Sequence, residues 1–152
     1  MSGPIQTTLG QRSLEVLIEV PRGSFVKRDA RGSFEFLSPL PCPFNYGSVP
    51  ALLAADRDTR DAVVMGPRLS AGSRVSCQVQ ALIVFLDAGV QDDKLICAAR
   101  PLDPAEAQRV LRFFQLYARC KRLMNLMAGR RGPTRCLGWG DAARSLADTA
   151  TR

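Results

Sequence analysis

The chain has 152 residues, a formal net charge of +7 and no histidine. Its hydrophobic content of 46% and charged content of 23% are ordinary for a globular domain. Without histidine, the commonest general base and transition-metal ligand are excluded, and we expect any metal site to use oxygen ligands, which favour magnesium or manganese. The positive charge favours an anionic partner, either a nucleic acid or a small phosphate compound.

Five cysteines are spread unevenly along the chain, which argues against both a disulfide framework and a zinc site. No apolar run approaches the length of a membrane span, and the N-terminus lacks the basic-then-apolar layout of a secretory signal. We therefore expect a cytoplasmic protein with reduced thiols. We also expect a single domain over residues 1–152, in which residues 1–12 carry no periodic pattern and are loosely held.

The first part of the chain predicts short strands separated by turns and one loop. Residues 14–20 alternate apolar and polar side chains, which is typical of a half-buried strand. Residues 25–29 and 33–37 predict two more short strands joined by a turn. Residues 38–50 contain four prolines and one glycine, so we expect a loop there.

The second part predicts further strands and then helices. The strands are expected at residues 61–65, 74–86 and 94–99. A long amphipathic helix follows, with Asp103 as its N-cap, Pro104 in its first turn and Glu106 completing a capping box. A short helix is expected over residues 141–148. Strands followed by helices indicate an α+β fold, and we expect a small closed β-barrel with helices packed outside it.

Two acidic clusters lie at the ends of predicted strands, in the segments "DRDTRD" and "DAGVQDD". The aspartates of interest are Asp56, Asp58, Asp61, Asp87 and Asp92. Like charges this close repel one another and raise each other's pKa unless a cation lies among them. Bound cations would stabilise such a convergence of carboxylates. A solvated turn, partly neutralised by its own arginines, would also account for the first cluster.

Six segments follow one another in a characteristic order: "IEVPRGSFVK", "FNYGSVP", "DRDTRD", "DAGVQDDKL", "FFQLY" and "GWGDA". From about Leu14 to the chain end, this order resembles soluble family I inorganic pyrophosphatase. Its strongest element is D-x-D-x-x-D followed by D-x4-D-x-K, with N-Y-G upstream. The resemblance implies a five-stranded OB-like barrel with outer helices, and the magnesium-dependent cleavage of pyrophosphate into two phosphates.

The resemblance also implies a metal-and-water site at the acidic clusters. Tightly held Mg²⁺ ions, or Mn²⁺ as a substitute, would be bound by Asp56, Asp61 and Asp92. Asp61 would bridge toward the second ion, and Asp58 would orient and deprotonate the attacking water. Ions that arrive with the substrate would be bound by Asp87 and Glu19, with Asp29 as a further carboxylate.

Phosphate-binding roles are implied by the same resemblance for Lys27, Tyr46, Lys94 and Tyr117. Taken alone, each lysine could be an ordinary surface residue, and each tyrosine could lie at the edge of the core. Pyrophosphate is a multiply charged anion, so its hydrolysis depends on neutralised charge, which metal ions and these groups would supply. The resemblance also implies a homo-oligomer, a hexamer in bacterial members of the family.

The chain departs from the family pattern around one phosphate. Within the segment "DRDTRD", Arg57 replaces the family's usual glycine and Thr59 replaces its usual proline. Glu35 stands where the family has an arginine, Ala118 where it has a lysine, and Cys42 where it has a tyrosine. Each lost charge-assisted contact would cost on the order of 1.5–3 kcal/mol if it is not replaced. Cations that could compensate are Arg28, Arg31, Arg119 and Lys121.

The sequence is compatible with three functions. The first is a metal-dependent inorganic pyrophosphatase, an enzyme that acts on pyrophosphate. The second is a divergent protein of the same fold with weak or no turnover. The third is an OB-like module that binds single-stranded nucleic acid through the basic segment "RCKRLMNLMAGRRGPTR". The strands lack clear interleaving of aromatic and basic residues, which disfavours the nucleic-acid hypothesis.

Overall fold

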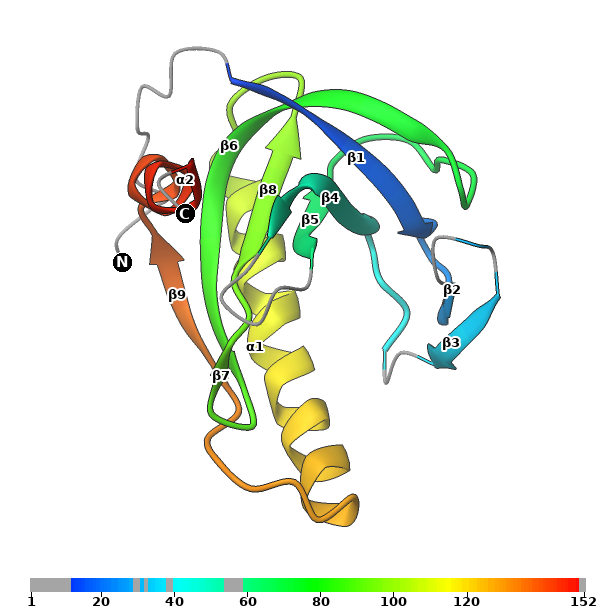
Figure 1. Ribbon diagram of the computed structural model, residues 1–152, viewed down its shortest axis with the longest axis vertical. Coiled ribbons are helices and arrows are strands. Elements are labelled where there is room, and N and C mark those ends of the chain that lie inside the picture. Colours follow the sequence, from blue (N-terminus) through cyan, green and yellow to red (C-terminus); the bar gives the residue numbers. More distant parts are fainter. Residues whose placement is uncertain (1–11, 29–30, 32, 38–39, 54–58, 151–152) are drawn as a thin grey trace.

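The computed structural model describes residues 12–150 except 29–30, 32, 38–39 and 54–58 (Figure 1). Its strands are β1 (Ser13–Val20), β2 (Val26–Arg28), β3 (Phe34–Leu37), β4 (Asn45–Leu53), β5 (Thr59–Val64), β6 (Arg74–Asp87), β7 (Val90–Gln91), β8 (Lys94–Ala98) and β9 (Arg135–Gly140). Its helices are α1 (Pro104–Met127) and α2 (Ala142–Ala150). Within the described residues, no helix is both long enough and apolar enough to cross a membrane.

Five strands close into a barrel in the order β1–β4–β5–β8–β6, because β6 also pairs with β1. Neighbouring strands run antiparallel, except β5 and β8, which are parallel. The 14 residues of β6 extend beyond the barrel, where they pair with β7 and β9. β2 and β3 form a separate two-stranded sheet beside the end of β1 (Figure 1). The expected α+β fold, a closed OB-like barrel with C-terminal helices outside it, is confirmed.

The barrel strands divide their apolar side chains between two clusters, because successive residues of a strand point to opposite faces. On β5, Val63 packs in a cluster that includes Phe114 of α1. Its neighbours Ala62 and Val64 pack in a second cluster, to which α2 contributes Leu146. β5 is therefore buried on both faces, and a charged side chain on this strand lies close to the core.

α1 begins where the sequence predicts. The Asp103 carboxylate accepts a hydrogen bond from the backbone N–H of Glu106 at 2.8 Å, and the Glu106 carboxylate accepts one from that of Asp103 at 3.0 Å. This reciprocal pair satisfies two of the N–H groups that a helix start leaves without partners. The helix then packs along the barrel, and the ring of Tyr117 lies 5.9 Å from that of Phe85 on β6.

The loop expected over residues 38–50 is wrong in its second half, which belongs to β4. Gly47 lets β4 approach β1 closely, because a Cβ atom at this position would lie 1.9 Å from the carbonyl oxygen of Leu17. The pairing of β4 with β5 shifts register between Val49 and Leu53, and Pro50 lies in this irregular stretch. Glycine and proline here mark a close strand approach and an irregular pairing, not a loop.

The sequence does not predict β9, which the structure places between the two helices. β9 runs antiparallel to β6, with Trp139 opposite Ile83. Gly140 packs so tightly on this strand that a Cβ would lie 2.5 Å from a methyl group of Val84. The short helix expected near the C-terminus is confirmed as α2.

Candidate active site

The centre of the candidate site is Asp61 on β5, between β4 and β8. In the strand register, Asp61 lies opposite Lys94 of β8. The Lys94 ammonium group donates a hydrogen bond to Asp61 Oδ2 at 2.6 Å. The hydroxyl of Tyr46, on β4, donates to the same oxygen at 2.6 Å. Three residues from separate sequence motifs therefore meet at one carboxylate oxygen.

Lys94 joins this carboxylate to a second one. Its Nζ atom also lies 2.7 Å from Asp92 Oδ2, and the lysine residue is 2% exposed. Burial by itself would lower the pKa of Lys94, but the charges of Asp61 and Asp92 and the hydrogen bonds to them outweigh it, so the pKa is raised. Lys94 therefore remains a cation at neutral pH. Its burial shows that it is not an ordinary surface lysine, which the sequence alone left possible.

The two carboxylates respond to this cation in opposite ways. Burial would raise the pKa of Asp61, but the charge and hydrogen bond of Lys94, together with the hydrogen bond from Tyr46, hold that pKa below its ordinary value. For Asp92, burial and the nearby charge of Asp61 prevail over Lys94, and the pKa is raised. Asp61 is thus the more firmly ionised member of the pair.

Both tyrosines of the site are hydrogen-bond donors at neutral pH. Burial, followed by the charges of Asp61 and Asp92, raises the pKa of Tyr46 well above its ordinary value. Burial is also the main reason that the pKa of Tyr117 rises to about 12. A neutral phenol can donate a hydrogen bond to a carboxylate or phosphate oxygen.

Glu19 and Lys27 lie beside this centre. Lys27 Nζ is 3.7 Å from Glu19 Oε2, and the hydroxyl of Ser48 donates to Glu19 Oε1 at 3.0 Å. The charge of Lys27 contributes to the lowered pKa of Asp61, which places it within electrostatic reach of that carboxylate. Ser48 is not predicted from the sequence, although it lies in "FNYGSVP" two residues after Tyr46.

Asp87 forms a second group, between the end of β6 and the C-terminal half of α1. The Asn125 side-chain amide donates to Asp87 Oδ1 at 2.7 Å, and Lys121 Nζ and a guanidinium nitrogen of Arg130 each lie 3.7 Å from Asp87 Oδ2. Asp87, like the Asp61–Asp92 pair, raises the pKa of Tyr117. The sequence does not predict Asn125, although it follows Tyr117 at two helical i, i+4 steps through Lys121.

Several predicted positions cannot be placed in this geometry. Asp56, the expected metal ligand, and Asp58, the expected water-orienting base, lie outside the described residues, as does Asp29. Glu35 lies in β3. Cys42 is a buried core residue, and burial raises the pKa of its thiol to about 11. Cys42 therefore supplies no charge to a phosphate at neutral pH.

The described donors fit a hard cation by their chemistry. Asp61 and Asp92 share one ammonium group, and their carboxylate oxygens are the ligands that Mg²⁺ and Mn²⁺ prefer. Among the residues that the structure describes, no group of three cysteine, aspartate or glutamate side chains is arranged to hold a metal ion. Asp56, the further ligand that the sequence predicts, lies outside the described residues, three residues before the start of β5.

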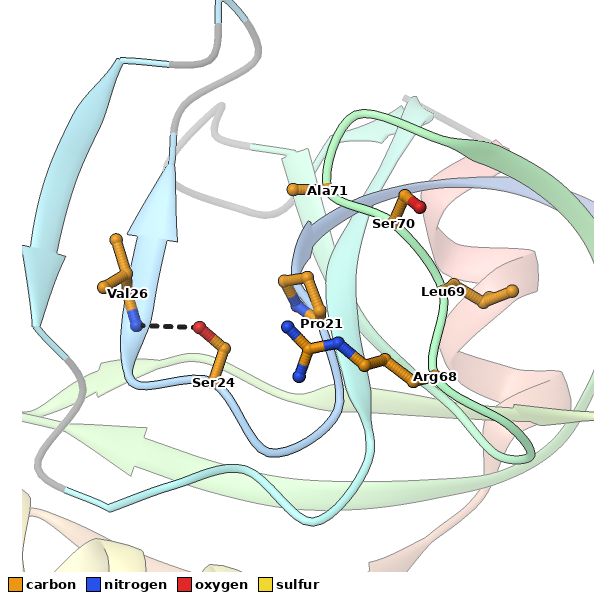
Figure 2. Close-up of a pocket in the computed structure, with 7 residues that line it drawn as sticks. All are labelled: Pro21, Ser24, Val26, Arg68, Leu69, Ser70 and Ala71. Carbon is orange, nitrogen blue, oxygen red and sulfur yellow. Dashed lines mark hydrogen bonds between the residues drawn. The ribbon is translucent and has the colours of Figure 1, made fainter.

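A pocket of about 450 Å³ lies elsewhere, between the β1–β2 connection and the β5–β6 connection (Figure 2). It is lined by Pro21, Ser24, Val26, Arg68, Leu69, Ser70 and Ala71. None of these residues belongs to the predicted site. The arrangement of titratable groups around Asp61 is therefore the better guide to chemistry.

The sequence and the fold have known relatives. The family model of inorganic pyrophosphatase matches residues 16–124. The inorganic pyrophosphatase of Gluconobacter oxydans is 36% identical over 92 residues, which cover 55% of this chain and 53% of that protein. The soluble inorganic pyrophosphatase of Oryza sativa subsp. indica is 31% identical over 121 residues, covering 66% and 56%. The chain thus spans about half the length of the curated relatives that it matches.

Solved structures share the fold. The inorganic pyrophosphatase of Thermus thermophilus superposes with a TM-score of 0.73 at 24% identity, over 98% of this chain and 93% of that one. The enzyme of Neisseria gonorrhoeae gives 0.72 at 22% identity, over 96% and 92%. The barrel, the helices and their connections are therefore an arrangement known from other proteins.

Proposed function

This chain belongs to the inorganic pyrophosphatase family, and from that premise we propose that it hydrolyses inorganic pyrophosphate to two phosphates with the help of a divalent metal ion. The observation that carries the proposal is the sharing of the buried Lys94 ammonium by Asp61 and Asp92. Two carboxylates around one buried ammonium group repel each other and are stabilised by the cation between them. A site built in this way suits an anionic substrate that arrives with metal ions.

The metal ion we propose is Mg²⁺, with Mn²⁺ as a substitute. Its proposed ligands are Asp56, Asp61, Asp92, Asp87 and Glu19. When bound, such ions would neutralise the charge of pyrophosphate and lower the pKa of a water molecule. We assign Asp58 the task of orienting this water and accepting its proton. The oxygen-only donor set and the lowered pKa of Asp61, which keeps that carboxylate ionised, support the proposed metal ligands.

The phosphate-binding groups we propose are Lys27, Lys94, Tyr46 and Tyr117. The raised pKa of Lys94 keeps its ammonium group charged, and the raised pKa values of both tyrosines keep their hydroxyls protonated. These groups can donate hydrogen bonds to phosphate oxygens from positions on β2, β4, β8 and α1. Donors that are already oriented stabilise the charge that develops on the leaving phosphate.

A phosphate-release assay tests this function. We expect the purified chain to release phosphate from pyrophosphate in the presence of Mg²⁺, and to stop when a chelator removes the ion. Release that fails with Mg²⁺ and Mn²⁺ alike would contradict the proposal and favour the divergent homologue without turnover. Salt-sensitive binding of a single-stranded oligonucleotide, without phosphate release, would favour the nucleic-acid module instead.

Three further expectations belong to the same proposal. We propose that residues 1–152 form a single pyrophosphatase-like domain, that the protein is cytoplasmic, and that it assembles into a homo-oligomer, with a hexamer as the expected form. Size-exclusion chromatography with light scattering would test the assembly. A mass equal to one chain would contradict it.

A further inference from the structure

We propose that Lys121 is a phosphate-binding residue of this site, held in position by Asp87, and that it replaces the lysine which the family pattern places at Ala118. The inference rests on the proposed function, since the phosphate belongs to pyrophosphate or its product. It assigns a cation to the part of the site where Ala118 stands in place of the family's lysine.

Ala118 is not a position from which a cation could reach the substrate without cost. The residue is 5% exposed and packs in the cluster between α1 and the barrel, which also contains Phe114. A lysine there would have to bring its charge out of an apolar contact, and an unpaired buried charge is strongly unfavourable. The alanine therefore serves the packing of the helix.

Lys121 lies one turn further along the same helix, on the side that faces the site. It follows Tyr117 by four residues, so the two side chains share one helix face. The Lys121 side chain is 17% exposed, and its Nζ lies 3.7 Å from Asp87 Oδ2. Tyr117 responds electrostatically to Asp87, Asp92 and Asp61, and it therefore links this end of the site to the centre.

The contacts of Asp87 fix its carboxylate and bring two cations to it. Asn125 donates to Asp87 Oδ1 at 2.7 Å and to the hydroxyl of Thr134 at 2.9 Å, so the amide is anchored on the connection between α1 and β9. Arg130 and Lys121 both lie 3.7 Å from the other carboxylate oxygen. Two cations are therefore held beside one carboxylate at this end of the site, and cations in fixed positions suit a phosphate oxygen.

Arg119, the other compensating cation that the sequence suggests on α1, is less suitable as a phosphate ligand. Arg119 is exposed on α1. It lies two residues from both Tyr117 and Lys121, so its side chain points away from their face of the helix. An exposed arginine on that side contributes a screened field but no direct contact with a phosphate bound near Tyr117.

Four proteins test the inference: the parent, Lys121→Ala, Lys121→Arg and Arg122→Ala. Arg122 is the adjacent exposed residue, and its replacement removes the same charge from the same helix. Binding of inorganic phosphate is measured by calorimetry with Mg²⁺ present, and kcat and KM are measured for pyrophosphate. We expect Lys121→Ala to weaken phosphate binding by about 10- to 100-fold, as for loss of a charge-assisted hydrogen bond.

The remaining variants separate a direct contact from general charge. Lys121→Arg should recover most of the phosphate affinity, because it restores a cation in the same place, and Arg122→Ala should stay within about 2-fold of the parent. An active parent whose Lys121→Ala variant binds phosphate equally well would overturn this inference and leave the proposed function intact. A parent that releases no phosphate from pyrophosphate would overturn the proposed function, and the inference with it.

Discussion

The two halves of the candidate site differ in the elements that hold them. Tyr46, Asp61 and Lys94 stand on three adjacent barrel strands, and both contacts to Asp61 measure 2.6 Å. Asp87 and Lys121 meet between the end of β6 and α1, at 3.7 Å. Hydrogen-bonded strand register fixes the first group, whereas the second depends on how a helix packs. Tyr46, Asp61 and Lys94 of the strand-held half match the family motifs, whereas Ala118, where the family has a lysine, lies on the helix that holds the second group.

Breaking the strand-held half should have the largest effect. Asp61→Ala leaves Lys94 buried with Asp92 as its remaining carboxylate, and the loss of the charged hydrogen bond to Asp61 costs about 1.5–3 kcal/mol of unfolding free energy. Repulsion among crowded aspartates alone would predict that Asp61→Ala stabilises the protein. The ammonium group between Asp61 and Asp92 attracts both carboxylates, so we expect a loss of stability. Urea denaturation of the metal-free protein measures the change.

The matched control for this variant is Glu15→Ala, which removes an exposed ion pair with Arg74. Exposed pairs contribute roughly 0–1 kcal/mol, so the control should stay close to the parent. An Asp61→Ala protein as stable as this control would contradict a buried charge cluster. The affinity of the Asp61→Ala variant for Mg²⁺ should also fall if Asp61 is a metal ligand.

Asp58→Asn sharpens the comparison, because it should affect the proposed chemistry without affecting the stability of the strand-held half. Loss of a general base lowers turnover by about 10²- to 10⁴-fold. The asparagine keeps the size of the side chain and can still accept a hydrogen bond. Phosphate release measures turnover, and circular dichroism checks that the fold persists. Equal turnover in variant and parent would remove Asp58 from the role of base.

Asn125→Ala breaks the helix-held half. Its amide is buried and donates hydrogen bonds to both Asp87 and Thr134, so its loss removes two hydrogen bonds, one of them to a carboxylate. We expect a loss of about 1–3 kcal/mol in urea denaturation. Gln115→Ala, an exposed change on the same helix, is the control. If the two variants prove equally stable, the Asp87 network does not hold this end of the site.

The smallest effect should be the dependence on pH. The pKa of folded Asp61 lies below its ordinary value of 3.8, so its stabilising contribution is fully present above pH 3.8 and is lost as the pH falls through the folded pKa. The raised pKa of Asp92 acts in the opposite direction and makes the net loss smaller. The stability difference between the parent and Asp61→Ala should therefore shrink in acid, and a difference that grows there would contradict it.

Local patterns in the sequence determine much of this protein. The alternation over residues 14–20 predicts β1, and the capping box at Asp103 and Glu106 predicts the start of α1, because both signals depend on neighbours within a few residues. The order of the motifs likewise predicts the family. These features need no knowledge of which strands pair.

Only the tertiary structure decided what depends on contacts between distant segments. Gly47 and Pro50 resemble loop residues until β1 lies against β4, and β9 becomes a strand because β6 extends far enough to pair with it. The sequence cannot show that Lys94 neutralises both Asp61 and Asp92, or that Lys121 and Asn125 meet at Asp87. Strand register and helix packing bring these charges within a few ångströms, and electrostatic interactions depend on that separation and on burial, not on distance along the chain.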